Sequence, residues 1–225
     1  MYSKIKMKQS VLLTGSDAID LLHRISTVDM KKPIGSDWAP ALFLNPQGKI
    51  LCFFEYTRPS IDSVQINFDE NFLEILDQFT FSEKYKIEPV SIKSGGTNGT
   101  LSEKDRIEKM IPKVGHEFLN NGETNPLEVN LRGAVHDNKG CYPGQEVIEK
   151  IISLGSPAKK LCLLSGVTSE SLPTALFDSK TGAEVGTLTS ASDGVALGII
   201  RRTHLKENLE LKTKTALFTL KKVSP

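Results

Sequence analysis

Residues 137–150 read DNKGCYPGQEVIEK and place a cysteine in a glycine-rich turn, just ahead of a segment with helical periodicity. Pro143 suits the first turn of a helix. The apolar face of that helix would consist of Val147, Ile148, Ile151 and Ile152. Cys141 would then lie just before a helix N-terminus and two residues from Lys139, where positive potential favours the thiolate. The alternative is a small buried cysteine in a turn, and local physics alone favours this alternative.

The other two cysteines, Cys52 and Cys162, are predicted to be buried on strands. Three cysteines far apart do not make a disulfide framework, so a reduced, cytoplasmic compartment is the default. The four histidines are scattered without ligand spacing and no C-x-x-C is present, so a zinc or cluster site made by the chain's own side chains alone is not expected. P-loop, dinucleotide and G-x-S-x-G signatures are also absent from the sequence.

The composition indicates a folded protein of two domains. The chain has 225 residues, of which 39% are hydrophobic and 24% are charged, and its net charge is +1. Residues 151–225 contain ten Lys and Arg against six Asp and Glu, an excess of +4. This asymmetry is too small to name a partner, and no apolar run is long enough to span a bilayer. Neither nucleic acid nor a membrane is therefore expected as a direct partner.

The N-terminal two thirds has the pattern of an α+β domain. Residues 4–13, KIKMKQSVLL, are expected to form an edge strand, with a weak organelle-targeting segment as the alternative. Helices are expected in GSDAIDLLHRIS, with Ser16 as N-cap, and in ENFLEILDQF. Residues 41–57, ALFLNPQGKILCFFEYT, read as a hairpin whose second arm is a central strand, apolar on both faces. Further strands are expected in SVQINF and YKIEPVSI.

The remaining chain divides at two breaks. Residues 93–100, KSGGTNGT, form the clearest breaker. The next helix is expected to start at Ser102, paired with Asp105 as in a capping box, and to end at Pro112. From Ser156 onward, short strands separated by turns predict a small antiparallel barrel or sandwich, and we choose the barrel. The predicted domains are residues 1–155 and 156–225.

The segment KGCYPGQE resembles the signature of the YgfZ family, relatives of the glycine-cleavage T-protein (aminomethyltransferase). That signature is Lys-Gly-Cys, an aromatic residue, any residue, then Gly-Gln-Glu. The likeness extends to LLTGSDAIDLLHRISTVDM, where Thr27 and Asp29 match a Thr and an Asp of the family, and to LNPQGKILCFFEYTR. DRIEKMIPKVGHEF with NPLEVNL, and TGAEVGTLTSASDGVALGIIRR, are similar at the level of pattern. The resemblance therefore covers nearly the whole chain.

The resemblance implies a T-protein-like folate-binding fold, with antiparallel sheets flanked by helices, plus the barrel. It implies a role in assembly or maintenance of iron–sulfur clusters in client enzymes, including radical enzymes that modify tRNA. The key thiol would be Cys141, in a loop shaped by Lys139, Gly140, Tyr142, Gly144, Gln145 and Glu146. Tetrahydrofolate would be the ligand, with Arg106 and Glu128 as candidates for lining its cavity. The alternatives are a solvated helix-face charge for Arg106 and an exposed strand-end acid for Glu128.

Two departures from the family pattern narrow the expected function. The T-protein has an acidic residue soon after the hairpin glycine, whereas no Asp or Glu lies between Gly48 and Glu55. The middle of the chain is also short near residues 93–101, where the family has part of its folate wall. An accessory protein without classical turnover is therefore preferred. The alternatives are a folate-dependent aminomethyltransferase or one-carbon enzyme, and a degenerate binding module without folate.

Overall fold

The structure is a computed structural model that describes residues 9–32, 37–92 and 101–225. The chain divides into two units that are each discontinuous in sequence. The first comprises Met1–Gly99, Asn120–Thr124 and Arg132–Lys150. The second comprises Thr100–Leu119, Asn125–Leu131 and Ile151–Pro225. The barrel strands all lie beyond residue 156, but their unit also takes in earlier segments, so the two-domain boundary at residue 155 stays a prediction.

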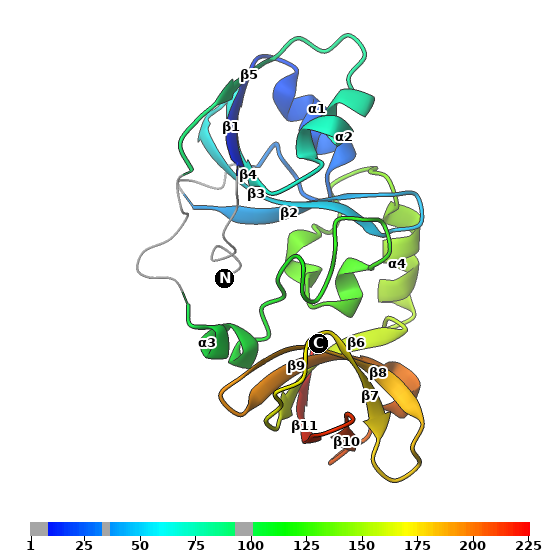
Figure 1. The fold of residues 1–225 in the computed structure, drawn as a ribbon. Helices are drawn as coiled ribbons and strands as arrows, with labels where there is room; N and C mark the ends of the chain where they lie inside the picture. Colours follow the sequence, from blue (N-terminus) through cyan, green and yellow to red (C-terminus); the bar gives the residue numbers. More distant parts are fainter. Residues whose placement is uncertain (1–8, 33–36, 93–100) are drawn as a thin grey trace. The chain divides into compact units, whose positions relative to one another are not determined.

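The first unit is an antiparallel sheet with two helices on one face (Figure 1). The strand order is β2-β3-β4-β1-β5. The strands are β1 Gln9–Thr14, β2 Ala39–Leu44, β3 Ile50–Ser60, β4 Ser63–Phe68 and β5 Lys86–Pro89. The helices are α1 Ala18–Ile25 and α2 Phe72–Gln78.

The core of this unit lies between the sheet and the two helices. Alternate residues of β3, among them Cys52 and Phe54, are fully buried on the face that packs against α1 and α2. Phe43 of β2 lies 4.8 Å from Phe54 and 5.2 Å from Phe72 of α2, measured between ring centroids. These aromatic contacts fix the helices on the sheet. The hairpin and the internal position of β3 are therefore confirmed.

Two local predictions in this unit are wrong. Strand β1 is not an edge strand, because β4 pairs with one side of it and β5 with the other. Residues 4–8 of the predicted strand lie outside the described residues. The N-cap of α1 is Asp17 rather than Ser16. Asp17 is held from two directions, since Ser16 Oγ donates to its Oδ1 and the Lys84 amide donates to its Oδ2, each at 2.8 Å.

The second unit contains α3 Glu103–Glu108, η1 Pro126–Glu128 and the barrel, while η2 Arg132–Ala134 belongs to the first unit. Ser102 caps α3 as predicted, because its Oγ accepts from the Asp105 amide at 3.1 Å. The helix ends at Glu108 and not at Pro112. Met110 adopts a left-handed conformation with φ of 52°, which stops the helix before the proline is reached.

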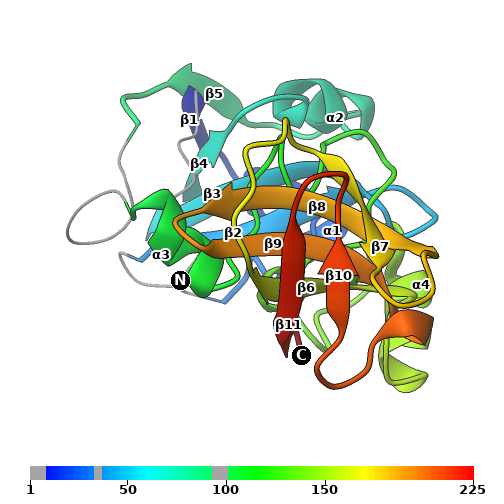
Figure 2. The ribbon, with the colours of Figure 1, turned by 60° about the horizontal axis from the view of Figure 1, so that its bottom comes forward.

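A closed antiparallel barrel forms the C-terminal part (Figure 2). The strand order is β10-β11-β6-β9-β8-β7. The strands are β6 Lys159–Ser165, β7 Thr174–Asp178, β8 Glu184–Ser192, β9 Val195–Arg201, β10 Glu210–Lys212 and β11 Leu217–Val223, and η3 Arg202–His204 precedes β10. Cys162, Leu176, Leu188 and Phe218 fill its interior. The predicted barrel is confirmed, and closure leaves no free strand edge in it.

Helix α4, Gln145–Ser153, begins two residues after Pro143. Its predicted apolar face is only partly correct. Ile148 is fully buried, Val147 and Ile151 are partly exposed, and Ile152 is 39% exposed. Among the helices of the described residues, none is long and apolar enough to cross a membrane.

Candidate functional site

Cys141 lies on an exposed loop, unlike the other two cysteines. Cys52 and Cys162 are fully buried, and burial raises the pKa of each thiol, to about 12 for Cys162. The interpretation of Cys141 as a small buried residue is therefore wrong, and the predicted burial of Cys52 and Cys162 is confirmed. Of the three thiols, Cys141 is the one that a partner in solution can reach.

Gly144 fixes one end of the Cys141 loop against the β2–β3 hairpin. Its φ is +81°, and a Cβ atom added there would lie 2.5 Å from the carbonyl oxygen of Asn45 and 2.9 Å from the Cα of Gly48. No side chain fits at that distance. The hairpin turn itself is held by Asn45, whose Oδ1 accepts from the amides of Gln47 and Lys49 at 3.0 Å and 2.9 Å.

Lys139 fixes the other end of the loop to helix α1. Its side chain is buried, its Nζ donates to the carbonyl oxygen of His23, and the same nitrogen lies 5.1 Å from the ring centroid of Tyr142. A cation at the C-terminal turn of a helix is stabilised by the helix dipole. Burial lowers the pKa of Lys139 to about 8, and the nearby Asp29 and Cys141 oppose that shift. The amine therefore loses its proton at a lower pH than an ordinary lysine.

Asp29 contacts two histidines, His23 and His136, that are far apart in the sequence. His23 Nδ1 lies 3.1 Å from Asp29 Oδ1, at ion-pair distance but without the geometry of a hydrogen bond. The amide of Asp29 donates to Nδ1 of His136 at 3.0 Å. Because Nδ1 accepts this bond, we assign the proton of neutral His136 to Nε2. Burial lowers the pKa of both imidazoles, so both are largely neutral at pH 7.

The carboxylate of Asp29 is kept ionised in this surrounding. Burial opposes ionisation, but the Lys31 amide, which donates to Oδ1 at 3.1 Å, and the cations around it hold the pKa of Asp29 below its usual value. Lys32 Nζ lies 3.5 Å from Oδ2. The site therefore combines one carboxylate, two largely neutral imidazoles and an amine with a lowered pKa in the unit that carries the exposed thiol.

Thr27 ties this cluster to the sheet. Its fully buried Oγ1 donates to the carbonyl oxygen of Ala134 at 2.6 Å and accepts from the amide of Leu42 at 3.1 Å. The amide of His136 in turn donates to the carbonyl oxygen of Thr27 at 2.9 Å. Thr27 and Asp29, singled out by the resemblance, thus contact the segment that leads into the signature.

The remaining residues of the signature differ in their surroundings. Tyr142 is buried, and burial raises the pKa of its hydroxyl to about 12. Gln145 Nε2 donates to Glu149 Oε1 at 2.6 Å along α4, and Glu146 is exposed on the same helix. A Cβ atom added to Gly140, whose φ is +98°, would lie 3.9 Å from His23 Nε2. The loop therefore passes directly over the imidazole of His23.

Sequence reasoning missed His23 and His136. They are separated by more than a hundred residues, and their spacing carries no ligand pattern. The available signal was the position of His23 in the same segment as Thr27 and Asp29. Only the fold, which places residues 27–29 beside residues 134–136, brings the two imidazoles together.

Arg106 lies in the second unit, where it is buried in an ion-paired network. Its Nη1 donates to Glu117 Oε2 at 2.9 Å and to the carbonyl oxygen of Ile111 at 2.6 Å. Its Nη2 donates to Glu103 Oε1 at 2.7 Å and to Ser190 Oγ at 2.6 Å. The alternative of a solvated helix-face charge is therefore wrong. These contacts join α3 to the barrel strand β8.

Glu128 is also buried and belongs to the capping box of η1. Its Oε2 accepts from the amide of Asn125 at 3.3 Å, while Asn125 Oδ1 accepts from the amide of Leu127. The alternative of an exposed strand-end acid is therefore wrong. The side chains of Arg106 and Glu128 are both engaged in internal hydrogen bonds, so a contact of either one with tetrahydrofolate would have to displace these bonds. Their contact with folate stays a prediction.

The fold of the chain is similar to that of aminomethyltransferase T of the glycine cleavage system from Bartonella henselae. The TM-score is 0.74, and the match covers 96% of this chain and 82% of that chain at 14% sequence identity. The likeness shows the fold, and the predicted T-protein-like α+β fold is confirmed.

Sequence comparisons match two parts of known proteins to this chain. Residues 160–224 match the family model described as the C-terminal beta-barrel domain of CAF17. A chloroplastic protein of Arabidopsis thaliana that carries a provisional transferase name is 37% identical over 93 residues. That match spans 41% of this chain but only 20% of the Arabidopsis protein.

The fold is therefore similar to that of the T-protein, and the barrel is similar to the C-terminal domain of CAF17. These two findings support the resemblance to the YgfZ family that the sequence indicated.

Proposed function

We propose that the protein is a YgfZ-type accessory protein for the assembly or maintenance of iron–sulfur clusters, with Cys141 as its working thiol. The observation that carries the proposal is the position of Cys141. It is exposed, while Lys139 on one side is bonded to α1 and Gly144 on the other is packed against the hairpin turn. An accessible thiol on a loop held at both ends suits repeated contact with partner proteins.

The groups around the loop supply what a reactive thiol needs. A thiolate is the reactive form of cysteine, and formation of the thiolate releases a proton. The imidazole of His23 is largely neutral, because burial lowers its pKa, so it is a suitable proton acceptor. The ammonium form of Lys139 also provides positive charge two residues from the sulfur. The role needs no classical turnover by this chain.

The partners we propose are iron–sulfur client or assembly proteins in the cytoplasm. Support comes from the YgfZ resemblance and from three unpaired cysteines, which suit a reducing compartment. The clients implied by the family include radical enzymes that modify tRNA, so contact with RNA would be made by the client and not by this chain.

Tetrahydrofolate is the ligand that we propose for the fold. The support is the likeness to the T-protein, and no step of the proposed role depends on it. Isothermal titration of the full chain with tetrahydrofolate tests this part separately. One-to-one binding would exclude the alternative of a degenerate module without folate, and no heat at high protein concentration would favour that module.

Aminomethyl transfer is the weaker alternative, for reasons that concern β3. No acid lies between Gly48 and Glu55, and Glu55 itself is buried. Burial raises the pKa of Glu55 to about 8, so this carboxyl is mostly protonated at neutral pH. A protonated buried acid does not supply the carboxylate that the transferase places soon after the hairpin glycine.

Complementation tests the proposed role. In a strain that lacks its own family member, the wild-type chain should restore growth that depends on iron–sulfur enzymes, and Cys141→Ala should not. Because Cys141 is exposed, the variant should unfold at the same temperature as the wild type, which excludes a folding defect. Full rescue by Cys141→Ala would overturn the role of the thiol.

A further inference from the structure

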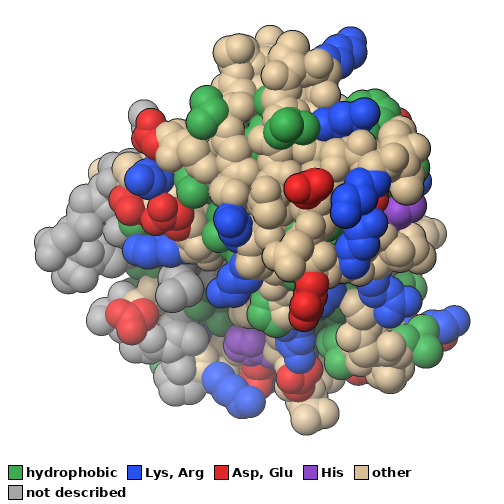
Figure 3. All heavy atoms as spheres, turned by 90° about the horizontal axis from the view of Figure 1, so that it is seen from below, with side chains coloured by type: hydrophobic (Ala, Val, Ile, Leu, Met, Phe, Trp, Pro, Cys, Tyr) green, Lys and Arg blue, Asp and Glu red, His purple; other side chains and the backbone are tan. Residues whose placement is uncertain are grey.

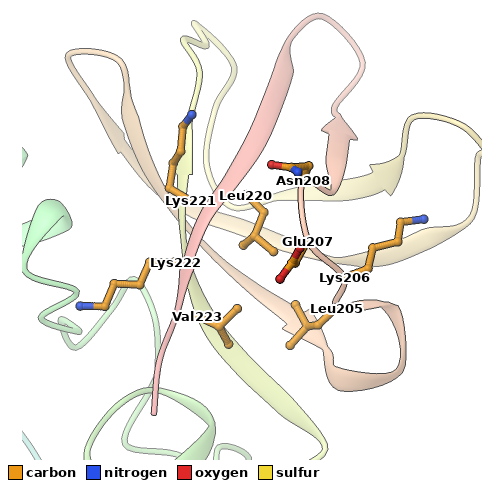
Figure 4. A pocket seen from close by; sticks show the side chains of 8 residues that line it. All are labelled: Leu205, Lys206, Glu207, Asn208, Leu220, Lys221, Lys222 and Val223. Carbon is orange, nitrogen blue, oxygen red and sulfur yellow. The ribbon is translucent and has the colours of Figure 1, made fainter.

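A groove on the barrel lies between β11 and residues 205–208, the segment that joins η3 to β10 (Figure 4). Its volume is about 520 Å³, and clefts that bind ligands have volumes of roughly 300–1,000 Å³. All of its lining residues come from these two segments, so the groove belongs to the second unit alone. Nothing in the proposed role of Cys141 uses it.

The floor of the groove is aliphatic. Leu205, Leu220 and Val223 pack against the barrel core and stay partly exposed. Figure 4 shows these three side chains in the space between the two segments. An aliphatic side chain of a ligand would remove part of this surface from water and gain about 25 cal/mol for each Å² buried.

The rim of the groove carries three lysines. Figure 4 shows Lys221 and Lys222 on the β11 side, with side chains that extend away from the aliphatic floor, and Lys206 on the opposite side. Lys206 Nζ lies 3.0 Å from Asp178 Oδ2, so the ammonium group of Lys206 is already in an ion pair. Lys221 and Lys222 are exposed and have no ion pair with any residue that the structure describes. Glu207 is the one acid of the lining.

The part of the chain that contains the groove has a positive net charge. Residues 151–225 carry an excess of four positive charges. Seen from below in Figure 3, Lys and Arg side chains lie across the face together with Asp and Glu side chains, and exposed hydrophobic side chains lie between them. Such a surface attracts an acidic partner and orients it before contact.

We propose that this groove binds an acidic segment of a partner protein, with an aliphatic residue on the floor and carboxylates at the lysines. The residues that line it, as far as the structure describes them, include neither an aromatic ring for base stacking nor an arginine for bidentate phosphate contacts. An aliphatic floor gives no advantage to a phosphodiester backbone. A protein segment therefore fits better than nucleic acid.

Fluorescence anisotropy with the full chain tests this proposal. The probe is a short fluorescein-labelled peptide made of repeats of Glu-Asp-Leu-Leu-Asp-Glu. We expect saturable binding that weakens about tenfold in the variant Lys221→Glu/Lys222→Glu, because two attractions become repulsions. The matched control is Lys180→Glu/Lys214→Glu, which makes the same charge change at exposed barrel lysines outside the groove and should bind like the wild type.

Changes in the probe keep the test independent of protein folding. A peptide with Ser in place of Leu should bind more weakly to the wild-type chain, because the floor then buries no aliphatic group. Absence of saturable binding, equal losses in both lysine variants, or no effect of the Leu-to-Ser change would each overturn the proposal. So would a uridine oligonucleotide that displaces the peptide and binds more tightly. None of these outcomes bears on Cys141.

Discussion

The α-carbon of Gly144 packs so closely against the carbonyl oxygen of Asn45 that an added Cβ atom would lie 2.5 Å from that oxygen. One glycine of the signature is therefore explained by packing alone. The same contact joins the loop of Cys141 to the β2–β3 hairpin, which is the most strongly patterned element of the sequence.

Replacement of Gly144 by Ala should lower the free energy of unfolding by more than the cost of a positive φ alone. Gly182 is a matched control, because it has a φ of 72° but no atom within 4 Å of an added Cβ. Gly182→Ala should lose about 1 kcal/mol from the positive φ. Gly144→Ala should lose about 1–3 kcal/mol more of the free energy of unfolding, because the added Cβ clashes with Asn45. Each kcal/mol lost should lower the Tm by about 2–4 °C. Equal thermal shifts of the two variants would contradict the close packing.

Removal of the Thr27 hydroxyl should weaken the attachment of the sheet to the segment that carries His136. Thr27→Val keeps the shape of the side chain but leaves the carbonyl oxygen of Ala134 and the amide of Leu42 with one partner fewer. We expect a loss of about 1–3 kcal/mol in the free energy of unfolding, measured by urea denaturation. The exposed Thr203 is the control, and its replacement by Val should change little.

The buried amine of Lys139 predicts a specific dependence of stability on pH. Burial lowers its pKa from 10.5 to about 8, so the unfolded chain binds more protons at this site between those two values. Stability from this group therefore rises as the pH increases from about 8 to about 10. Lys139→Met removes the amine. The difference in unfolding free energy between wild type and variant should rise over this range, and a flat difference would contradict the lowered pKa.

Removal of one partner of the ion pair between Arg106 and Glu117 should destabilise the protein. The side chain of Glu117 is fully buried, and the side chain of Arg106 is nearly so. Arg106→Met leaves the carboxylate of Glu117 unpaired and should cost about 3–5 kcal/mol of stability. The double variant Arg106→Met/Glu117→Leu should recover part of that loss. Additive losses in this double-mutant cycle would show that the two side chains do not interact.

Elements with local signals were predictable from the sequence. The hairpin at residues 41–57 combines two apolar strands with Asn-Pro-Gln-Gly, and each strand is specified by its own residues. The barrel was predictable for the same reason, since short strands alternate with turns. The N-cap of α1 was missed by one residue because Ser16 and Asp17 are both residue types that favour this position. The side chain of Asp17 accepts from the distant amide of Lys84 and makes no capping bond to the helix, so the local sequence carries no signal that separates the two.

Long-range relationships were not predictable. β1 is internal because residues 86–89 return to pair with it, and no property of β1 itself shows that. The approach of His23 and His136 to Asp29 depends on the whole first unit. The buried ion-paired network of Arg106 was neither the predicted cavity lining nor its alternative, a surface charge, because it depends on contacts with Glu117 and with the distant Ser190. The exposure of Cys141 likewise depends on how its loop is anchored.

The most direct measurement of the central claim is the specific activity of an iron–sulfur enzyme in cells whose only family member is this chain. The variants to compare are Cys141→Ser, which replaces one sulfur atom by oxygen, and Lys180→Ala, an exposed barrel residue, as control. We predict activity at the wild-type level with Lys180→Ala and at the level of the empty strain with Cys141→Ser, at equal amounts of folded protein. Full activity with Cys141→Ser would contradict the account.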